Sequence, residues 1–431
     1  MRKTLPLIAS LLIGMGLVQL GNGLLTTVIS LRMAIEGFST EMAGLVLSAY
    51  FAGQMAAART IPRLIGVVGP VRVFAASAAV LAAGALSQVL VLVAVAWVAL
   101  RAITGYGMAG LNMVAESWLN TRATNENRGQ ILALYMVMVY LATGLGQFLL
   151  NLGDPSSFDL FALSTVLITV GLVPVALTRA PTPSFAERSG LSFRQLYRLS
   201  PLGVAGVVGT GLVNGSFYGL GPIFARDIGF DDAGIANFMG VTILAGLLLQ
   251  WPVGRLSDIF DRRTVLTVVF LGVAIVSVAM IAALRMHPIW VLAAGALYGG
   301  LSFTTYSLSV SHACDFIKSD DLVKATGSFV MAYGIGAVLG PLVAAWAMSF
   351  AGPAALFGYT AIINALLGVF ALYRMTRRKA MPKDQQGQFV GLPQTTPMVE
   401  DLDPRAARGA EPHGPVYVGG ARRDTPPTST D

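Results

Sequence analysis

Long apolar segments alternate with short polar turns along most of this chain. Each apolar segment has about 20 residues, which is the length that an α-helix needs to cross a bilayer. None shows the alternating polarity of a membrane-spanning strand. The pattern predicts an all-α membrane protein with twelve transmembrane helices, at residues 5–31, 41–61, 71–89, 92–117, 129–152, 158–178, 201–225, 233–254, 264–284, 288–311, 324–349 and 354–374.

A polar segment at residues 179–200 divides the spans into two sets of six. Prolines and arginines replace apolar residues there, and this shift in composition predicts a domain boundary. We expect residues 1–178 to form an N-terminal six-helix bundle and residues 201–379 a C-terminal one. Residues 179–200 are then a cytoplasmic linker.

After Lys379 the chain changes character. Residues 380–431 are rich in Pro, Gly and Thr, with mixed charge and little periodic apolar content. Such a sequence cannot bury enough apolar surface to fold alone. We therefore expect a disordered, solvated and dispensable cytoplasmic tail, the alternative being a segment that binds a partner.

The two sets of spans repeat a pattern of polar residues and glycines in the same direction. The offset is 192 to 194 positions, and it relates Asn22 to Asn214, Arg32 to Arg226, Gly37 to Gly229 and Gly146 to Gly340. Internal repeats are a building principle of transporters. The repeat predicts two pseudo-symmetric copies of one membrane module.

The distribution of positive charge predicts the orientation of the chain in the membrane. The net charge of +7 could suggest nucleic acid, but the cations lie in the short turns between apolar segments, so membrane topology explains them better. Almost all of them fall on one side, and the opposite turns hold only Arg32, Arg226 and Arg285. By the positive-inside rule, both termini are expected to be cytoplasmic.

Metal and enzyme chemistry find little support. The single Cys314 excludes an intrachain disulfide, and the three histidines are too scattered in sequence to suggest a zinc site. No nucleophile–base arrangement or nucleotide-binding loop stands out. We expect no enzyme activity, no cofactor and no nucleic-acid partner.

Polar residues inside a span are costly, so each is a functional candidate. In the fourth span Arg101, Asn112 and Glu116 fall within about 60° of one another on the helix, which predicts one polar stripe lining a central cavity. The alternative is that Arg101 is a structural strut and that Glu116 pairs with cations at the interface.

The first and seventh spans carry similar polar pairs. Gln19 lies near Asn22, and Asn214 lies near Tyr218, with Asn22 and Asn214 related by the repeat. Such symmetry suits a substrate site between the halves. Helix–helix hydrogen bonding is an equally good explanation. Weaker substrate candidates come from spans eight and ten and are Gln250 and Tyr306.

The turn after the eighth span packs glycine with opposite charges. We expect gating residues there: Gly254, Arg255, Asp258, Arg262 and Arg263. Asp258 can cap a helix N-terminus and pair with Arg262 one turn on. Such a charge cluster can latch one face in one state and release it in the other. The alternative is that the cations only set topology.

Several motifs resemble the major facilitator superfamily (MFS). The sequence GRLSDIFDRR at 254–263 resembles the loop signature of that family, and Arg101 with Gly105 and Gly107 resembles its fourth-helix motif. The resemblance covers residues 5–378. Within the family, SAYFAG (48–53), ESWLN (116–120) and RGQILALYM (128–136) resemble the YcaD-like branch of bacterial transporters.

The resemblance implies a fold and a mode of action. It implies two six-helix bundles around a central cavity, rocker-switch alternating access, a monomer in the bacterial plasma (inner) membrane, and gating by Asp258 and the nearby arginines. The chain departs from the family pattern at two places. Ile61 and Ile65 stand where the first-half loop would repeat Gly254 and Asp258, and Gln147 stands where a Gly-Pro motif would have proline.

The leading hypothesis is a secondary active transporter, uptake or export, of a small organic solute. Arg101 favours an anionic or zwitterionic substrate. The alternatives are a lipid or amphiphile translocator on the same fold and a non-transporting membrane sensor. The expected partners are the small-molecule substrate and membrane lipid. Proton coupling stays open, because Glu116 is the one intramembrane acid to consider.

Overall fold

The computed structural model describes residues 5–124, 126–177, 192–317, 322–377, 381–382, 386–392 and 394 of the 431-residue chain. Regular structure within these residues is helical throughout, which confirms the all-α prediction. The helices are α1 (Leu5–Ile35), α2 (Thr40–Val68), α3 (Pro70–Leu90), α4 (Ala94–Arg122), α5 (Arg128–Phe148), the 3-10 helix η1 (Leu149–Leu152), α6 (Asp159–Ala176), α7 (Phe193–Leu199), α8 (Pro201–Asp227), α9 (Asp232–Ile259), α10 (Arg262–Ala283), α11 (Pro288–Ser302), α12 (Thr305–Cys314), α13 (Leu322–Ala351) and α14 (Ala355–Arg377).

Nine of the described helices are long and apolar enough to cross a membrane, or ten if α7 and α8, which are bent by 119°, form one span. The predicted count of twelve is therefore not confirmed by length and composition. The predicted span 288–311 is divided between α11 and α12. The hydroxyls of Thr304 and Thr305 donate to the carbonyl oxygens of Leu301 and Ser302, and such local bonds compete with helical ones.

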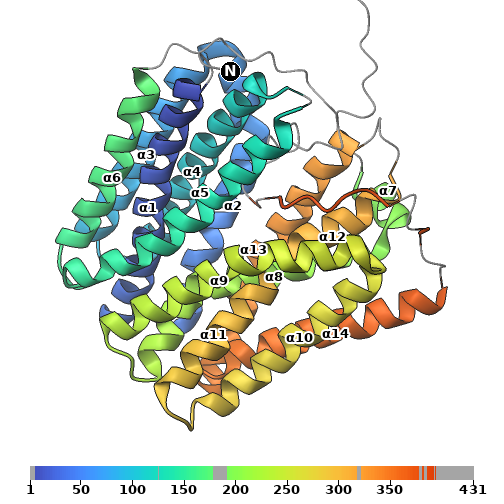
Figure 1. Cartoon of the computed structure of the whole chain (residues 1–431). Coiled ribbons are helices and arrows are strands. Elements are labelled where there is room, and N and C mark those ends of the chain that lie inside the picture. Colours follow the sequence, from blue (N-terminus) through green and yellow to red (C-terminus); the bar gives the residue numbers. More distant parts are fainter. Residues whose placement is uncertain are drawn as a thin grey trace, which may run out of the picture.

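The helices form two groups, which Figure 1 shows as α1–α6 in blue to green and α8–α14 in green-yellow to orange-red. The principal contacts between the groups are α2 with α13, α5 with α9, and α1 with α8. The predicted boundary at 179–200 lies mostly outside the described residues, and its last part forms α7 and Ser200. We call the two groups the first and second halves.

The sequence repeat corresponds to a repeated turn. Gly37 after α1 and Gly229 after α8 have φ angles of 73° and 94°, a left-handed conformation that favours glycine. Each turn is followed by a capped helix. Ser39 accepts a hydrogen bond from the backbone at the start of α2, and Asp231 does the same for α9. The two halves thus share local structure as well as sequence.

Two ends of the molecule differ in composition. The basic face is the end where α2, α4, α9 and α14 finish, and it carries Arg59, Arg63, Arg72, Arg122, Arg255 and Arg374. The opposite face carries the turns at Gly37 and Gly229. The halves meet closely near this opposite face, where Ser30 donates to the backbone oxygen of Gly219 at 2.8 Å. A side chain larger than that of Gly44 would collide with Pro341 and Ala345.

The tail prediction is wrong for part of residues 380–431. Residues 386–392 lie along the second half, and the side chains of Val390 and Leu392 are 8% and 1% exposed. Figure 1 shows this stretch in red crossing the second half beside α12. Composition failed here because the stretch does not fold alone but against a surface already formed by α9 and α12. The remaining tail residues, apart from 381, 382 and 394, lie outside the described residues.

Candidate functional site

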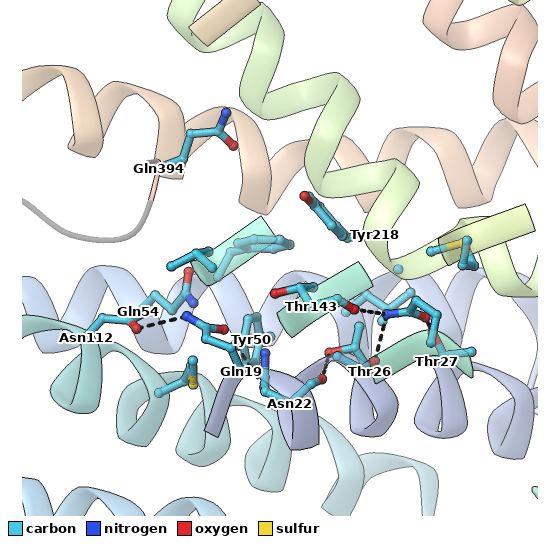
Figure 2. A pocket seen from close by; sticks show the side chains of 18 of the residues that line it. Gln19, Asn22, Thr26, Thr27, Tyr50, Gln54, Asn112, Thr143, Tyr218 and Gln394 are labelled. Atoms are coloured by element: carbon cyan, nitrogen blue, oxygen red, sulfur yellow. Dashed lines mark hydrogen bonds between the residues drawn. The ribbon is translucent and has the colours of Figure 1, made fainter. Parts of the chain in front are cut away.

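A cavity of about 160 Å³ lies between the two halves. Its wall comes from α1, α2, α4 and α5 of the first half, α8, α9 and α13 of the second half, and Gln394 (Figure 2). An engineered cavity of about 150 Å³ binds benzene, so the volume suits a molecule with one ring. The polar lining residues are Gln19, Asn22, Thr26, Thr27, Tyr50, Gln54, Arg101, Asn112, Tyr140, Thr143, Gln147, Tyr218, Tyr333 and Gln394.

Arg101 is the charged residue in this lining. Its side chain, on α4, is only 1% exposed, and its guanidinium carbon lies 4.2 Å from the ring centroid of Tyr50. Its Nη2 donates to the hydroxyl of Thr26 at 3.3 Å. Its Nε and Nη1 are buried without a hydrogen-bond acceptor among the residues that the structure describes. A buried guanidinium with free donors is costly unless an anion pairs with it.

Amides beside Arg101 connect α1, α2 and α4. Gln19 donates from Nε2 to Asn112 Oδ1 at 3.2 Å, and the Tyr50 hydroxyl lies 3.4 Å from Asn22 Oδ1. Figure 2 shows Gln19, Asn22 and Asn112 together on one side of the cavity. These bonds fix the orientation of the amides and leave further donors and acceptors for a ligand.

Gln147 completes this polar side from α5. Its Nε2 donates to the backbone oxygens of Gly23 and Thr143, both at 3.1 Å, and its Oε1 accepts from Thr27. The residue that replaces the expected proline of a Gly-Pro motif is thus a cavity residue. It ties α1 to α5 within the first half.

Aromatic side chains from both halves also line the cavity. Tyr218 of α8 stacks on Phe303 with ring centroids 5.2 Å apart and an interplanar angle of 8°. Tyr140 lies 6.2 Å from the same Phe303 ring, and Tyr333 packs edge-on against Tyr306 at 5.5 Å. The cavity lining therefore combines hydrogen-bonding groups with aromatic rings.

The structure places five of the nine predicted substrate residues at the cavity. They are Gln19, Asn22, Arg101, Asn112 and Tyr218. The predicted stripe on the fourth span is correct for Arg101 and Asn112. Glu116 lies outside the lining, is fully buried, and accepts a hydrogen bond from the Tyr135 hydroxyl at 2.9 Å.

Three other candidates also lie outside the cavity lining. Asn214 is fully buried in the second half and accepts from the Ser302 hydroxyl at 2.8 Å. Gln250 donates to Ser307 at 2.9 Å, and Tyr306 is buried under Tyr333. The expected symmetry of Asn22 and Asn214 thus holds in the sequence but not at the cavity, because α8 turns Asn214 toward α11.

The predicted gating residues lie together at the end of α9 and the start of α10. The predicted pair is confirmed, with Arg262 Nη2 lying 3.3 Å from Asp258 Oδ1. The closer partner is Asp315, which accepts from Arg262 Nη1 at 2.7 Å and 2.8 Å. We call Asp258, Arg262 and Asp315 the gate cluster. All three belong to the second half.

The predicted cap was assigned to the wrong residue. Asp258 lies inside α9, and Asp261 caps α10 by accepting from the backbone of Arg263. Asp261 also pairs with the Arg263 side chain at 3.4 Å. Arg255 lies 5.8 Å from the Trp251 ring, and Gly254 adjoins Phe389 of the tail segment. Helix α9 ends at Ile259, five residues after the predicted end of the eighth span at 254, so Asp258 lies inside the helix.

Sequence reasoning missed several residues of the site. The missed cavity residues include Thr26, Tyr50, Gln54, Thr143 and Gln147. Helical spacing could have found Thr26, which lies four positions from the predicted Asn22, since residues four apart share a face. Asp315 gave no such signal, because its partner Arg262 is 53 positions away. No three described His, Cys, Asp or Glu residues lie close enough together to hold a metal ion.

Comparison with known proteins agrees with this architecture. The family profile described as Major Facilitator Superfamily matches residues 11–281 and 203–408. The uncharacterized MFS-type transporter YcaD of Escherichia fergusonii is 32% identical over 374 residues, which are 86% of this chain and 96% of that protein. YcaD of Shigella flexneri is 33% identical over 340 residues, which are 78% of this chain and 88% of that protein.

Solved transporters share the fold at low sequence identity. The nucleoside transporter NupG superposes with a TM-score of 0.67 at 15% identity, over 86% of this chain and 100% of that one. An inward-facing bacterial homologue of the human lysosomal transporter Spinster gives a TM-score of 0.64 at 16% identity, over 93% and 95%. The family profile and the YcaD relatives establish that the chain belongs to the Major Facilitator Superfamily, and the solved transporters share its fold.

Proposed function

We propose that this protein is a secondary active transporter of a small organic anion or zwitterion that carries a flat ring. The observation that carries the proposal is Arg101, whose Nε and Nη1 are buried at a cavity between the halves without a described acceptor. A carboxylate could accept from Nε or from Nη1, and charge-assisted bonds of this kind are strong and directional. The ring would then lie toward Tyr218.

Alternating access supplies the mechanism. The halves touch closely near the opposite face, and the gate cluster lies at the basic face. Rocking of one half against the other about a midplane site would expose the cavity to each side in turn. By the positive-inside rule the basic face is cytoplasmic, in the bacterial inner membrane. Glu116 with Tyr135 remains the acid to test for proton coupling.

Ligand-dependent stability of the purified protein tests the proposal. The panel consists of aromatic carboxylates, each matched with its neutral amide, and the readout is the melting temperature. A ligand at 100 times its dissociation constant stabilises by about 2.7 kcal/mol. We expect carboxylates to raise the melting temperature and amides not to. Arg101→Ala should weaken carboxylate binding by roughly 10- to 100-fold, since a charged hydrogen bond contributes about 1.5–3 kcal/mol.

Arg285→Ala is the matched control, because Arg285 is an exposed arginine outside the cavity lining. It should leave the ligand response unchanged. Equal responses to acids and amides, or equal responses of the Arg101→Ala variant and the native chain, would contradict the proposal.

A further inference from the structure

The polar groups of the gate cluster bind the backbone of the chain's own C-terminal segment. Asp258 Oδ1 accepts from the backbone amide of Phe389 at 2.7 Å. Asp315 Oδ1 accepts from the amide of Gly387 at 3.1 Å, and Arg262 Nη2 donates to the Gly387 oxygen at 2.6 Å. Each member of the cluster therefore contacts the segment as well as its neighbours.

A second group of contacts lies deeper toward the cavity. The hydroxyl of Ser307 accepts from the amide of Leu392 at 3.0 Å and donates to its oxygen at 3.2 Å. Gln250 donates to the same hydroxyl. Asp258, a predicted gating residue, and Gln250, a predicted substrate residue, thus both lie at the surface that binds the C-terminal segment.

Side chains of the segment also pack against the second half. The ring of Phe389 lies against Gly254, where any larger residue would collide with it. Val390 and Leu392 are buried. The glycine of the family-like loop signature therefore provides the space for an aromatic side chain. Recognition combines backbone hydrogen bonds with one aromatic and two aliphatic anchors, as in a bound extended peptide.

The end of the segment reaches between the halves. Gln394 lines the central cavity together with Gln54 and Tyr333. It also lines a smaller neighbouring pocket between Met55 of α2 and Gly334 of α13. Figure 2 shows Gln394 across the cavity from Gln19 and Asn112. The segment thus occupies space that the halves would need in order to close on the basic face.

We propose that α9, α10 and α12 form a peptide-binding site whose ligand is the segment described at residues 386–392 and at Gln394, and that this bound segment holds the basic face open. The segment binds one state and blocks the other, so its occupancy shifts the equilibrium toward the open state. The docked stretch begins nine positions after Arg377, where α14 ends. A tether this short gives an effective concentration on the order of millimolar, so weak contacts suffice.

The inference rests on the proposed alternating-access function but not on the identity of the cargo. Transport requires the segment to leave the gate cluster in each cycle. Any partner that captures the tail, or any modification that weakens its docking, would then release the transporter. The segment therefore acts as a tethered inhibitor that prevents the two halves from closing at the basic face.

Distances between the halves test the inference without a substrate. The chain has one cysteine, so Cys314→Ala gives a cysteine-free background. Spin labels on Val67→Cys and Thr376→Cys, which are both exposed, report the basic face. Labels on Leu152→Cys and Met286→Cys report the opposite face. Pulsed electron paramagnetic resonance then gives the distance distribution for each pair.

The variants are Phe389→Asp in the full chain, deletion of 386–394, and deletion of 395–431 as the matched control. In the native chain and the control we expect one long basic-face distance, with a shorter population below about a tenth. Phe389→Asp and the 386–394 deletion should make the shorter population prominent, and the opposite-face pair should lengthen in parallel. Identical distributions in all four proteins would overturn the inference.

A synthetic peptide of residues 384–396 provides the reverse test. Added to the 386–394 deletion variant, it should restore the long basic-face distance, and the same peptide with Phe389→Asp should not. Absence of any effect of the native peptide at millimolar concentration would contradict a peptide-binding site. Because neither experiment uses the cargo, failure of the Arg101 test would leave this result standing, and failure here would leave the Arg101 proposal standing.

Discussion

The turn between α2 and α3 and the turn between α9 and α10 occupy equivalent places in the two halves, yet they are held in different ways. In the first half Ile61 and Ile65 are buried, at 1% and 0% exposure. In the second half Gly254 and Asp258 stand at these positions, and Asp258 contacts Arg262 and the backbone of Phe389. One turn is fixed by apolar packing and the other by polar contacts.

The difference assigns different tasks to the two turns. Apolar packing within one half is lost only when that half comes apart. Polar groups can exchange partners at small net cost whenever the new partner offers the same hydrogen bonds. We infer that the first-half turn is a static support and that the second-half turn is the moving gate. The predictions below test this contrast, beginning with the largest effect.

A charge at Ile65 should have the largest effect. Ile65→Asp copies the second-half residue into a fully buried apolar position, where a carboxylate lacks a partner. We expect destabilisation above about 4 kcal/mol and little folded protein by size-exclusion chromatography. Ile65→Leu is the control and should cost less than about 1.5 kcal/mol. A stable Ile65→Asp variant would show that the first-half turn also accepts a polar latch.

Loss of the Arg262 side chain should have the second largest effect on stability. Arg262 and Asp315 are 1% and 3% exposed, so Arg262→Met removes one partner of a buried ion pair. We expect a loss of about 3–5 kcal/mol, measured by unfolding in detergent. Replacing both residues, Arg262→Met with Asp315→Leu, should recover much of this loss. Arg72→Ala at the exposed first-half turn should change stability by less than about 0.5 kcal/mol. Similar losses of stability in the Arg262 and Arg72 variants would contradict the proposed difference between the two turns.

Asp258→Ala should separate stability from gating. The side chain is 40% exposed, so its ion pair contributes less than about 1 kcal/mol. The same change removes the acceptor for the Phe389 amide, so the shorter basic-face distance should become populated. The spin-label pairs described above measure this shift. A large loss of stability with unchanged distances would make Asp258 a structural residue rather than a gating one.

Arg255→Ala should have the smallest effect. Arg255 lies on the exposed side of α9, 5.8 Å from the ring of Trp251, which is itself 69% exposed. We expect a change below about 0.5 kcal/mol and unchanged distances, because solvent screens such a contact. A clear change in the spin-label distances would show that Arg255 takes part in gating together with the gate cluster.

The sequence predicted those features that depend on local pattern. The length of the apolar segments located nearly every helix, and intramembrane polarity located Arg101 and its neighbours on α1 and α4. Periodicity also placed Glu116 on the same stripe, but the stripe is long and its lower end faces α5 rather than the cavity. Spacing along one helix predicts which residues share a face, but the packing of the helices determines whether that face contacts the cavity or another helix.

Partners distant in sequence could not be predicted. Asp315 follows α12 without a motif, and its role depends on the fold bringing it to Arg262. The tail segment looked solvated because its composition cannot form a core of its own. Its backbone groups are bound by Asp258, Asp315 and Ser307, and composition carries no information about such contacts.

Counterflow in proteoliposomes tests the central claim most directly. The vesicles hold the aromatic carboxylate that stabilises the purified protein best, and radiolabelled carboxylate is added outside. We expect transient accumulation in vesicles with the native protein and with Arg285→Ala, and at least a tenfold slower rate with Arg101→Ala. Equal accumulation with and without the Arg101 side chain would contradict the claim that Arg101 binds the transported anion.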